Sequence, residues 1–430
     1  MIVNARRKTG ALDLEALEQA TRTALHRAGA RLLEALLGES DEQGEPPLCL
    51  CGHAMRCAGA RPKRLVSLLG AVTLQRPYYH CRRCWRGVAP LDRELAIEGT
   101  QYSPGVRRML AVVGGETAFA RGRALLAELA GVEVSAKAVE RQAEAIGSDL
   151  AAQAESDRGQ AAQRAFPPQR GPSIPTLYIE MDGTGIPVTA AASAGRQGKD
   201  GATARTREVK LGCVFTQTDL DAEGRPARDA RSTTYTGAIE DAEAFGPRIY
   251  HEAWRRGLHR ADRQVVIGDG AAWIWNLSHS YFPNAIEIVD IYHSREHLWE
   301  LGRQLFPLDR QQRRRWVRRR KKQLDDGRIE HLVRSLRGIQ ADTPELSEKL
   351  RIEAAYFEGN ADRMRYAEFR RLDLFVGSGV IEAGCRSVIG SRLKRSGMFW
   401  TVDGANAIIA LRCALLSNRF EDYWEDRAAA

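Results

Sequence analysis

The chain has 430 residues, 43% of them hydrophobic, so it is long enough for two or three folded domains, and its composition excludes disorder as the default state. Lys and Arg (64) outnumber Asp and Glu (55), and the formal net charge of +9 favours polyanionic partners, above all nucleic acid. No run approaches the roughly 20 apolar residues of a membrane span, and the N-terminal residues lack the apolar stretch of a signal peptide. The sequence therefore predicts a cytoplasmic protein with no membrane partner.

The first predicted element is an N-terminal helical region over residues 1–45. Leucines and alanines recur at helical spacing from 11 to 38, and a polar run at 38–44 ends the pattern. We expect this helix to serve packing or dimerisation.

Residues 46–92 contain five of the eight cysteines. A spacer with strand-like segments at 65–69 and 72–74 separates two short cysteine pairs. Two such knuckles around a hairpin predict a zinc ribbon, in which Zn²⁺ is structural because four protein ligands leave no open position. The predicted ligands are Cys49, Cys51, Cys81 and Cys84.

The first cysteine pair is unusual, because only one residue separates Cys49 from Cys51. Cys57, His53 or His80 could therefore replace one ligand. The alternative to a metal site is a set of buried free thiols.

Residues 93–160 return to a helical pattern. Gly131 separates two segments, and Ser135 is placed to cap the second. This arrangement fits a DNA-binding helix-turn-helix or a plain helical hairpin equally well. A linker into the next domain is indicated by Pro167, Pro168, Gly171, Pro172 and Pro175.

The rest of the chain predicts an α/β domain with a mixed sheet flanked by helices, in two parts at 174–307 and 373–420. Between the parts, residues 308–372 are highly charged and predict an all-helical insertion. Strands are expected at 177–182, 208–216, 230–235, 264–268 and 285–290, and helices at 239–256, 271–280 and 292–306.

Three carboxylates of this domain stand in settings that suit a metal ligand. Asp182 and Asp269 follow apolar, strand-like runs, and Glu382 falls in the first turn of a helix that Ser378 could cap. Hard oxygen ligands of this kind can hold two Mg²⁺ or Mn²⁺ ions across a scissile phosphate. A single Asp-Gly pair is more often a turn, but two after apolar strands, followed by the Glu, favour the metal site.

Asp290 and His293 follow the last predicted strand. They could lie near the scissile phosphate, or Asp290 could simply cap the next helix and leave His293 half exposed. Trp316, within the basic run 313–322, could stack on an unpaired base or anchor its helix. The run itself could bind phosphates or be a solvated helix face. The predicted DNA-binding residues are Arg313, Arg314, Arg315, Arg318, Arg319, Arg320, Lys321, Lys322, Arg386, Arg392 and Lys394.

The order of these motifs resembles that of a DDE insertion-sequence transposase. The resemblance rests on Asp182-Gly183-Thr184-Gly185, Gly268-Asp269-Gly270-Ala271, Asp290-x-x-His293 and Gly377-Ser378-Gly379-Val380-Ile381-Glu382. The zinc-ribbon start and the block at 389–400 look like the bacterial ISKra-type group, relatives of Mutator-like transposases. The similarity spans roughly residues 46–418.

This resemblance implies an RNase H-like catalytic core and a divalent-metal mechanism. Asp182, Asp269 and Glu382 would be the metal ligands, and Asp290 with His293 would match the Asp-x-x-His element of Mutator-like enzymes. The expected function is cleavage of transposon ends and strand transfer into target double-stranded DNA by a homodimer or larger homo-oligomer, associated with the bacterial nucleoid. The alternatives are a zinc-ribbon regulator with an inactive core and a nuclease that does not transpose.

Overall fold

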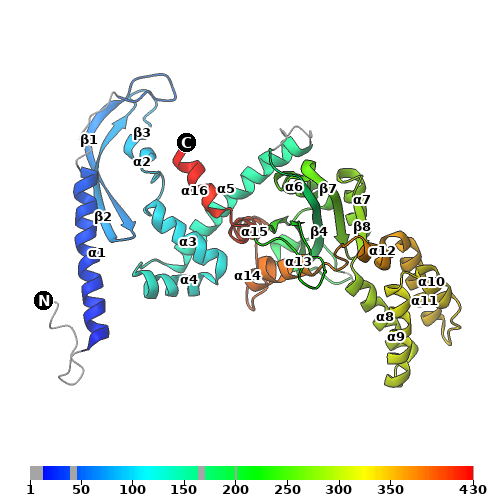
Figure 1. Cartoon of the computed structure of the whole chain (residues 1–430). Coiled ribbons are helices and arrows are strands. Elements are labelled where there is room, and N and C mark those ends of the chain that lie inside the picture. The colour runs from blue at the N-terminus through cyan, green and yellow to red at the C-terminus, as the bar shows by residue number, and fades with distance from the viewer. Residues whose placement is uncertain (1–12, 39–45, 163–169, 199–200, 430) are drawn as a thin grey trace. The chain divides into compact units, whose positions relative to one another are not determined.

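The computed structural model describes residues 13–38, 46–162, 170–198 and 201–429, and it has a mixed α/β fold (Figure 1). The chain divides into two compact units, residues 1–144 and 145–430, each with its own sheet. Within the described ranges, no helix combines the length and the apolar character that crossing a membrane requires.

The first unit is built on a three-stranded antiparallel sheet in the order β1-β2-β3. Helix α1 packs on β2 through Ala30 and Leu33, and the core between them includes Leu65 and Leu74. The elements are α1 (Leu14–Gly38), β1 (Arg56–Ser67), β2 (Gly70–His80), β3 (Gly87–Val88), α2 (Pro90–Glu94), α3 (Pro104–Glu116), α4 (Phe119–Leu125), a π-helical turn (Leu126–Ala130) and α5 (Ala136–Ala162), which continues into the second unit.

The predicted break between two helices in the first unit is confirmed. Gly131 adopts a left-handed backbone (φ 65°), which ends the preceding helix and suits glycine because it has no Cβ. The Ser135 hydroxyl accepts a hydrogen bond from the Ala138 backbone N–H at 3.1 Å and so caps α5. Whether this helix pair reads DNA stays a prediction.

The second unit contains a five-stranded mixed sheet in the order β6-β5-β4-β7-β8. Strand β5 is antiparallel to both β4 and β6, whereas β7 runs parallel to β4 and β8 runs parallel to β7. The strands are β4 (Ile174–Pro187), β5 (Thr206–Gln217), β6 (Thr234–Ala238), β7 (Ala261–Gly268) and β8 (Ile286–Val289).

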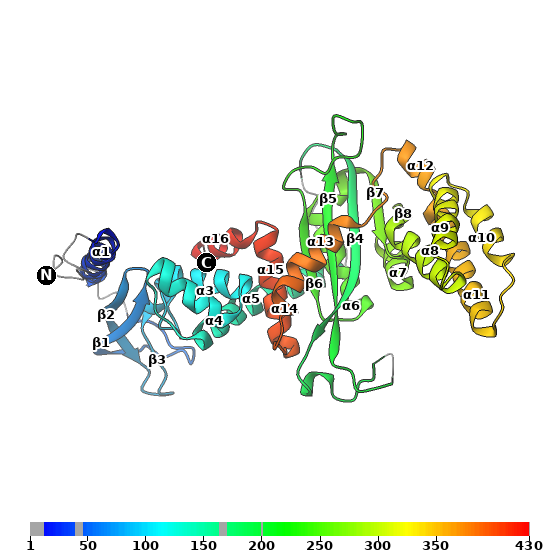
Figure 2. The same ribbon diagram turned by 90° about the horizontal axis from the view of Figure 1, so that it is seen from below.

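Helices cover both faces of this sheet. Helix α6 packs against β5 and β6, while α13 lies along β4 and β5, and Figure 2 shows α13 beside β4. A Cβ at Gly212 would meet Ile249 of α6, whereas Leu211, its neighbour on β5, reaches Gly384 of α13. Because neighbouring residues of a strand point to opposite faces, Leu211 defines the α13 face.

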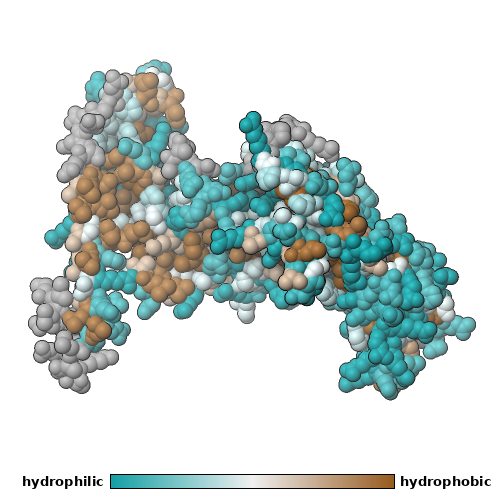
Figure 3. All heavy atoms as spheres, viewed as in Figure 1, coloured by the Kyte–Doolittle hydropathy of each residue, from teal (hydrophilic) through white to brown (hydrophobic). Residues whose placement is uncertain are grey.

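The helices of the second unit follow the predicted order, and residues 310–371 contain only helices. Hydrophilic residues cover much of this helical segment in Figure 3. The helices are α6 (Ala242–Arg255), α7 (Ala272–Tyr281), α8 (Ile291–Leu305), α9 (Arg310–Asp325), α10 (Ile329–Arg337), α11 (Pro344–Gly359), α12 (Tyr366–Arg371), α13 (Gly379–Gly384), a π-helical segment (Cys385–Gly390), α14 (Ser391–Leu393), α15 (Val402–Leu416) and α16 (Phe420–Ala429).

Several strand boundaries differ from prediction, among them those of β1 and β2, which are longer than the predicted segments 65–69 and 72–74. The strand expected at 230–235 begins only at Thr234, because Asp229 closes a loop by accepting hydrogen bonds from Thr216 and Thr218, and Arg231 has φ 59°. Pro175, assigned to the linker, lies in β4. Pro167 and Pro168 lie outside the described residues.

Candidate active site and metal centres

The strand register brings Asp182, Asp269 and Asp290 to one edge of the sheet. Glu180 of β4 pairs with Ile267 of β7, so Asp182 and Asp269 each lie two residues further along parallel neighbours. Gly268 of β7 pairs with Val289 of β8, so Asp269 and Asp290 each follow directly. Three carboxylates from adjacent parallel strands therefore form a row where the parallel pairing ends.

The expectation that Asp182 ends its strand is wrong. β4 runs on to Pro187 because it pairs with β5 throughout, and Asp182 itself lies opposite Leu211. Only the parallel pairing with β7 stops near Asp182, while Asp269 does follow the last residue of β7.

Helix α13 carries Glu382 to the same edge. Glu382 lies in its first turn, as predicted, and is exposed. Cys385, three residues later, donates a hydrogen bond from its thiol to Asp182 Oδ2 at 3.3 Å. Residues three apart share a helix face, so Glu382 lies on the face of α13 that meets Asp182.

Two buried carboxylates hold the start of α13. Glu180 Oε2 accepts a hydrogen bond from the Ile381 N–H at 2.8 Å, and Asp290 Oδ1 accepts one from the Ser378 N–H at 3.2 Å. Ser378 occupies the N-cap position, but its own side chain makes no capping bond. The start of α13 is therefore capped by Asp290 and Glu180, and the prediction that Ser378 caps it is wrong.

The carboxylates influence one another electrostatically. Burial raises the pKa of Asp182, and repulsion from Asp269 adds to the rise, against hydrogen bonds from Cys385 and Gly183 that lower it. Burial also raises the pKa of Glu382, and the charges of Asp290 and Asp182 add to it. All four side chains therefore belong to one acidic site.

The predicted metal ligands approach one another without closing into a tight cluster. Among the residues that the structure describes, only the four cysteines bring three or more metal-ligand atoms within 4.8 Å of one another. At least one pair among Asp182, Asp269 and Glu382 therefore has its carboxylate oxygens farther apart than that. Carboxylate oxygens are the ligands that hard divalent cations prefer, and two ions about 3.5–4 Å apart can be held by carboxylates that do not all touch.

Asp290 is almost fully buried and caps α8 as well as supporting α13. Its Oδ1 accepts from the Tyr292 N–H and its Oδ2 from the His293 N–H, both at 3.1 Å. Its carboxylate is therefore occupied by backbone donors of two helices.

Replacing Asp290 by Ala should destabilise the second unit by about 2–4 kcal/mol, because two helix starts lose a buried acceptor. Asp241→Ala is the matched control, since Asp241 caps only α6 and should cost about 1 kcal/mol. Hydrogen exchange of the β8 amides in urea measures the loss of stability in each variant. Equal losses would contradict a double role for Asp290.

His293 begins a polar chain that sequence reasoning did not anticipate. Its Nε2 lies 3.3 Å from His297 Nε2, and His297 Nδ1 lies 2.7 Å from the buried Glu353 Oε2 on α11. Tyr356 of α11 stacks on His297 and donates a hydrogen bond to the Asp269 carbonyl at 3.2 Å. Helix α11 thus fixes both the histidine pair and the Asp269 loop.

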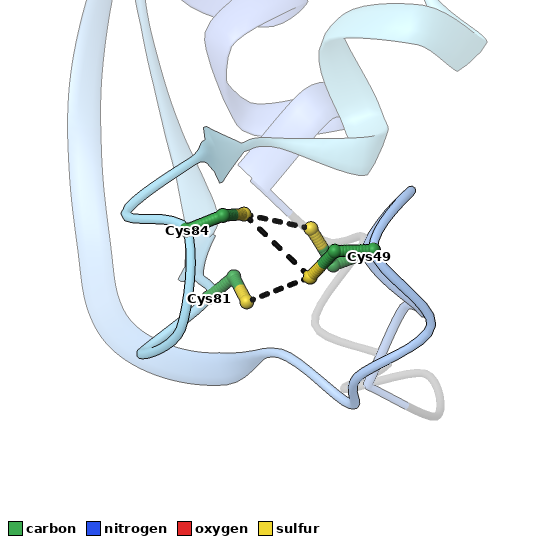
Figure 4. A group of neighbouring side chains, drawn as sticks. Cys49, Cys81 and Cys84 are labelled. Carbon is green, nitrogen blue, oxygen red and sulfur yellow. Dashed lines mark hydrogen bonds between the residues drawn. The ribbon is translucent and has the colours of Figure 1, made fainter.

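The first unit contains a cysteine site (Figure 4). The Sγ atoms of Cys49 and Cys84 are 3.3 Å apart, those of Cys51 and Cys81 3.5 Å, and those of Cys51 and Cys84 3.7 Å. A tetrahedral zinc site with Zn–S bonds near 2.3 Å requires S–S distances of about 3.8 Å, so the set fits Zn²⁺.

The environment of Cys81 also favours a thiolate ligand. Backbone N–H groups of Cys84 and Arg83 lower the pKa of Cys81 to about 6, with burial acting against them. Cys57 is exposed on β1 and is not in the cluster, and His53 hydrogen-bonds the Cys51 carbonyl through Nδ1 at 2.9 Å. The four predicted ligands therefore form the cluster, and His53 lies beside it, with Nδ1 3.6 Å from Cys51 Sγ.

The predicted DNA-binding residues of α9 divide into two groups. Arg314, Arg315, Arg318 and Arg319 are exposed on one helix face, and no acidic side chain of the described ranges pairs with them. By contrast, Arg313 donates to the Phe306 and Pro307 carbonyls, and Arg320 lies against Trp316 and donates to Gln323. Trp316 packs near Phe306, so it anchors the helix.

The remaining predicted DNA-binding residues, two at the end of α9 and three between residues 386 and 394, differ in exposure. Lys321 is half-buried, while Lys322 is exposed and lies 3.8 Å from Asp326. Arg386 and Lys394 are exposed, and Lys394 donates to Thr184 beside the acidic site. The prediction for Arg392 is wrong, because its side chain is completely buried and lies over Trp400, out of reach of a phosphate.

Comparison with known proteins adds three observations. The model of the family described as "Uncharacterised protein family (UPF0236)" matches residues 7–422. A Streptococcus gallolyticus relative, the UPF0236 protein in the vanSb 3' region, is 25% identical over 347 residues, which are 78% of this chain and 69% of the relative. The Drosophila P element transposase strand transfer complex aligns with 74% of this chain and 80% of its own at 9% identity, with a TM-score of 0.24, too low to carry an argument.

Proposed function

The chain belongs to the uncharacterised protein family UPF0236, and we propose that it is a DNA transposase that cleaves transposon ends and transfers the freed strands to target DNA. The observation that carries this proposal is the register-matched row of Asp182, Asp269 and Asp290, completed by Glu382 on a helix that contacts Asp182. The mixed five-stranded sheet, with helices on both faces, supports the proposal.

The acidic site supplies the ligands that phosphodiester chemistry needs. Asp182, Asp269 and Glu382 would hold Mg²⁺ or Mn²⁺, which, when bound, activates an attacking oxygen and stabilises the leaving one. Asp290 and Glu180 fix the helix that carries Glu382. His293, partly exposed and paired with His297, would accept or return a proton at the substrate oxygen.

The exposed face of α9 would hold flanking DNA through its phosphates. Arg314, Arg315, Arg318 and Arg319 point from one side of the helix without acidic partners in the described chain. Arginine is suited to this role because its guanidinium binds phosphate oxygens in pairs. Two copies would be needed to pair two transposon ends, so we expect a dimer or larger assembly.

Substitution of Arg318 and Arg319 by Ala should weaken DNA binding at all sequences. Each lost phosphate contact should make the negative slope of log K against log salt shallower by about 0.9, hence by about 1.8 for both. Fluorescence anisotropy over a salt series measures the slope. Arg337→Ala with Arg351→Ala is the control, because each already pairs with a glutamate, Glu358 and Glu348, on the same helical segment.

The test of the function is cleavage of DNA that carries the element's own terminal repeats. Purified protein with Mg²⁺ should nick this DNA at the repeat ends and join the freed 3'-hydroxyl to a target plasmid. Binding without any nicking would identify a regulator with an inactive core. Nicking without preference for the repeats would identify a nuclease that does not transpose.

A further inference from the structure

The ribbon of the first unit carries most of the protein's positive charge excess. Residues 46–92 contain eight Lys or Arg and one acidic residue, Asp92, against +9 for the whole chain. Two of the eight, Lys63 and Arg76, are neutralised by the buried Asp92 of α2. The other six are exposed, namely Arg56, Arg61, Arg64, Arg82, Arg83 and Arg86.

Four of these six gather at the metal-binding end of the ribbon. Arg82, Arg83 and Arg86 lie within or beside the second cysteine knuckle, and Arg56 pairs in the sheet with His80, the residue before Cys81. Within the described ranges no acidic side chain pairs with any of the four; Arg83 lies only 3.4 Å from His53 Nε2. Such an uncompensated basic surface attracts a polyanion.

Trp85, at the tip of this knuckle, has two unfavourable features. Its side chain is 81% exposed, and its backbone adopts φ 61°, which is rare for a bulky residue. The turn is fixed by the Cys81 N–H bond to the Arg86 carbonyl and by the Trp85 N–H bond to the Cys81 carbonyl, at 2.8 and 2.9 Å. Glycine would take this position without strain, so the indole is not there for the turn.

From these features we infer that the second knuckle of the ribbon is a nucleic-acid interface, in which Arg82, Arg83 and Arg86 contact phosphates and the Trp85 indole stacks on an unpaired base. An exposed aromatic ring among arginines is how proteins bind unstacked nucleotides, because every base offers a flat face and every nucleotide a phosphate. This inference rests on the proposed function, since staggered cleavage of the two strands at a DNA end leaves such bases.

The test is DNA binding by the full chain without Mg²⁺, in the Asp182→Asn background so that no DNA is cut. Fluorescence anisotropy compares a blunt duplex with the same duplex bearing a short single-stranded overhang. Trp85→Ala should weaken binding of the overhang duplex about tenfold and that of the blunt duplex less than about twofold. Trp85→Phe, which keeps an aromatic face, should retain most of the affinity.

Leu50→Ala is the matched control, because Leu50 is 89% exposed on the first knuckle and lacks an aromatic ring. It should bind both duplexes as the parent does. Arg82→Ala with Arg86→Ala should weaken both duplexes and flatten their salt dependence. Zinc content is measured for every variant, so that loss of the fold is recognised.

Two results with the variants would overturn the inference: wild-type affinity of Trp85→Ala for the overhang duplex, or a loss of affinity in Leu50→Ala equal to that in Trp85→Ala. A third would be displacement of the DNA by polyglutamate with the same dependence on Trp85. That result would identify an acidic protein as the partner. Failure of the proposed function looks different. In that case the wild type does not nick repeat DNA with Mg²⁺, whatever Trp85→Ala does to binding.

Discussion

Asp182→Asn is expected to lower Mg²⁺-dependent nicking of terminal-repeat DNA by at least about 10³-fold, equivalent to roughly 4 kcal/mol of the barrier, while DNA binding is unchanged. The carboxylate lies in the row of acids where the parallel strand pairing ends, and its pKa is raised by burial and by the nearby charge of Asp269. Asparagine keeps the size of the side chain but removes the charge that a cation requires. Asp269→Asn and Glu382→Gln should have the same effect.

Asp219→Asn is the matched control. Asp219 is exposed and lies just beyond the end of β5. The last residue of β5, Gln217, pairs with Thr176 near the start of β4, and this end of the strand pair is away from Asp182. The variant should nick at the parental rate. Full activity in any of the three carboxylate variants would remove that residue from the catalytic set.

Cys81→Ser is expected to abolish zinc binding and unfold the ribbon. Cys81 is completely buried, and its thiolate is favoured by two backbone N–H groups. Structural zinc contributes about 10–16 kcal/mol of binding free energy in small zinc-binding domains, and the hairpin of β1 and β2 encloses only a small core of its own. Metal analysis and hydrogen exchange of the β1 and β2 amides measure the loss.

Cys57→Ser provides the comparison within the same ribbon, because Cys57 is exposed on β1 and lies outside the four-cysteine cluster. It should retain one zinc ion and the exchange protection of the parent. The zinc assignment would fail if Cys81→Ser kept its metal, or if the protein purified without zinc and the strands were protected all the same.

Sequence patterns predicted the parts of this fold that depend on local periodicity. The apolar runs before Asp269 and Asp290 form buried parallel strands, and their alternation of strand and helix gives the predicted order around the sheet. The cysteine pairs were recognisable because their spacing reflects the geometry of a knuckle, and the structure brings all four together. Asp182 was misplaced within β4, because pairing with β5 extends that strand beyond its apolar part.

Contacts made only in three dimensions could not be predicted. Glu180 lies in an apolar run and gives no local signal, yet it is completely buried, burial raises its pKa to about 8, and it holds the Ile381 N–H 201 residues away. Tyr356 and Glu353 lie in the highly charged helical segment, whose sequence does not indicate that they contact the Asp269 loop and His297. Arg392 stands in a basic block but is buried, since charge in a sequence does not indicate exposure.

The convergence of Asp182, Asp269 and Glu382 on one metal centre can be tested directly by anomalous diffraction from crystals soaked in Mn²⁺. We predict a peak at the edge of the sheet where β4 and β7 cease to pair, with carboxylate oxygens of all three residues as ligands of one ion or of a close pair. The account would be contradicted if manganese bound elsewhere, or if any of the three carboxylates remained outside the coordination shell of the bound ions.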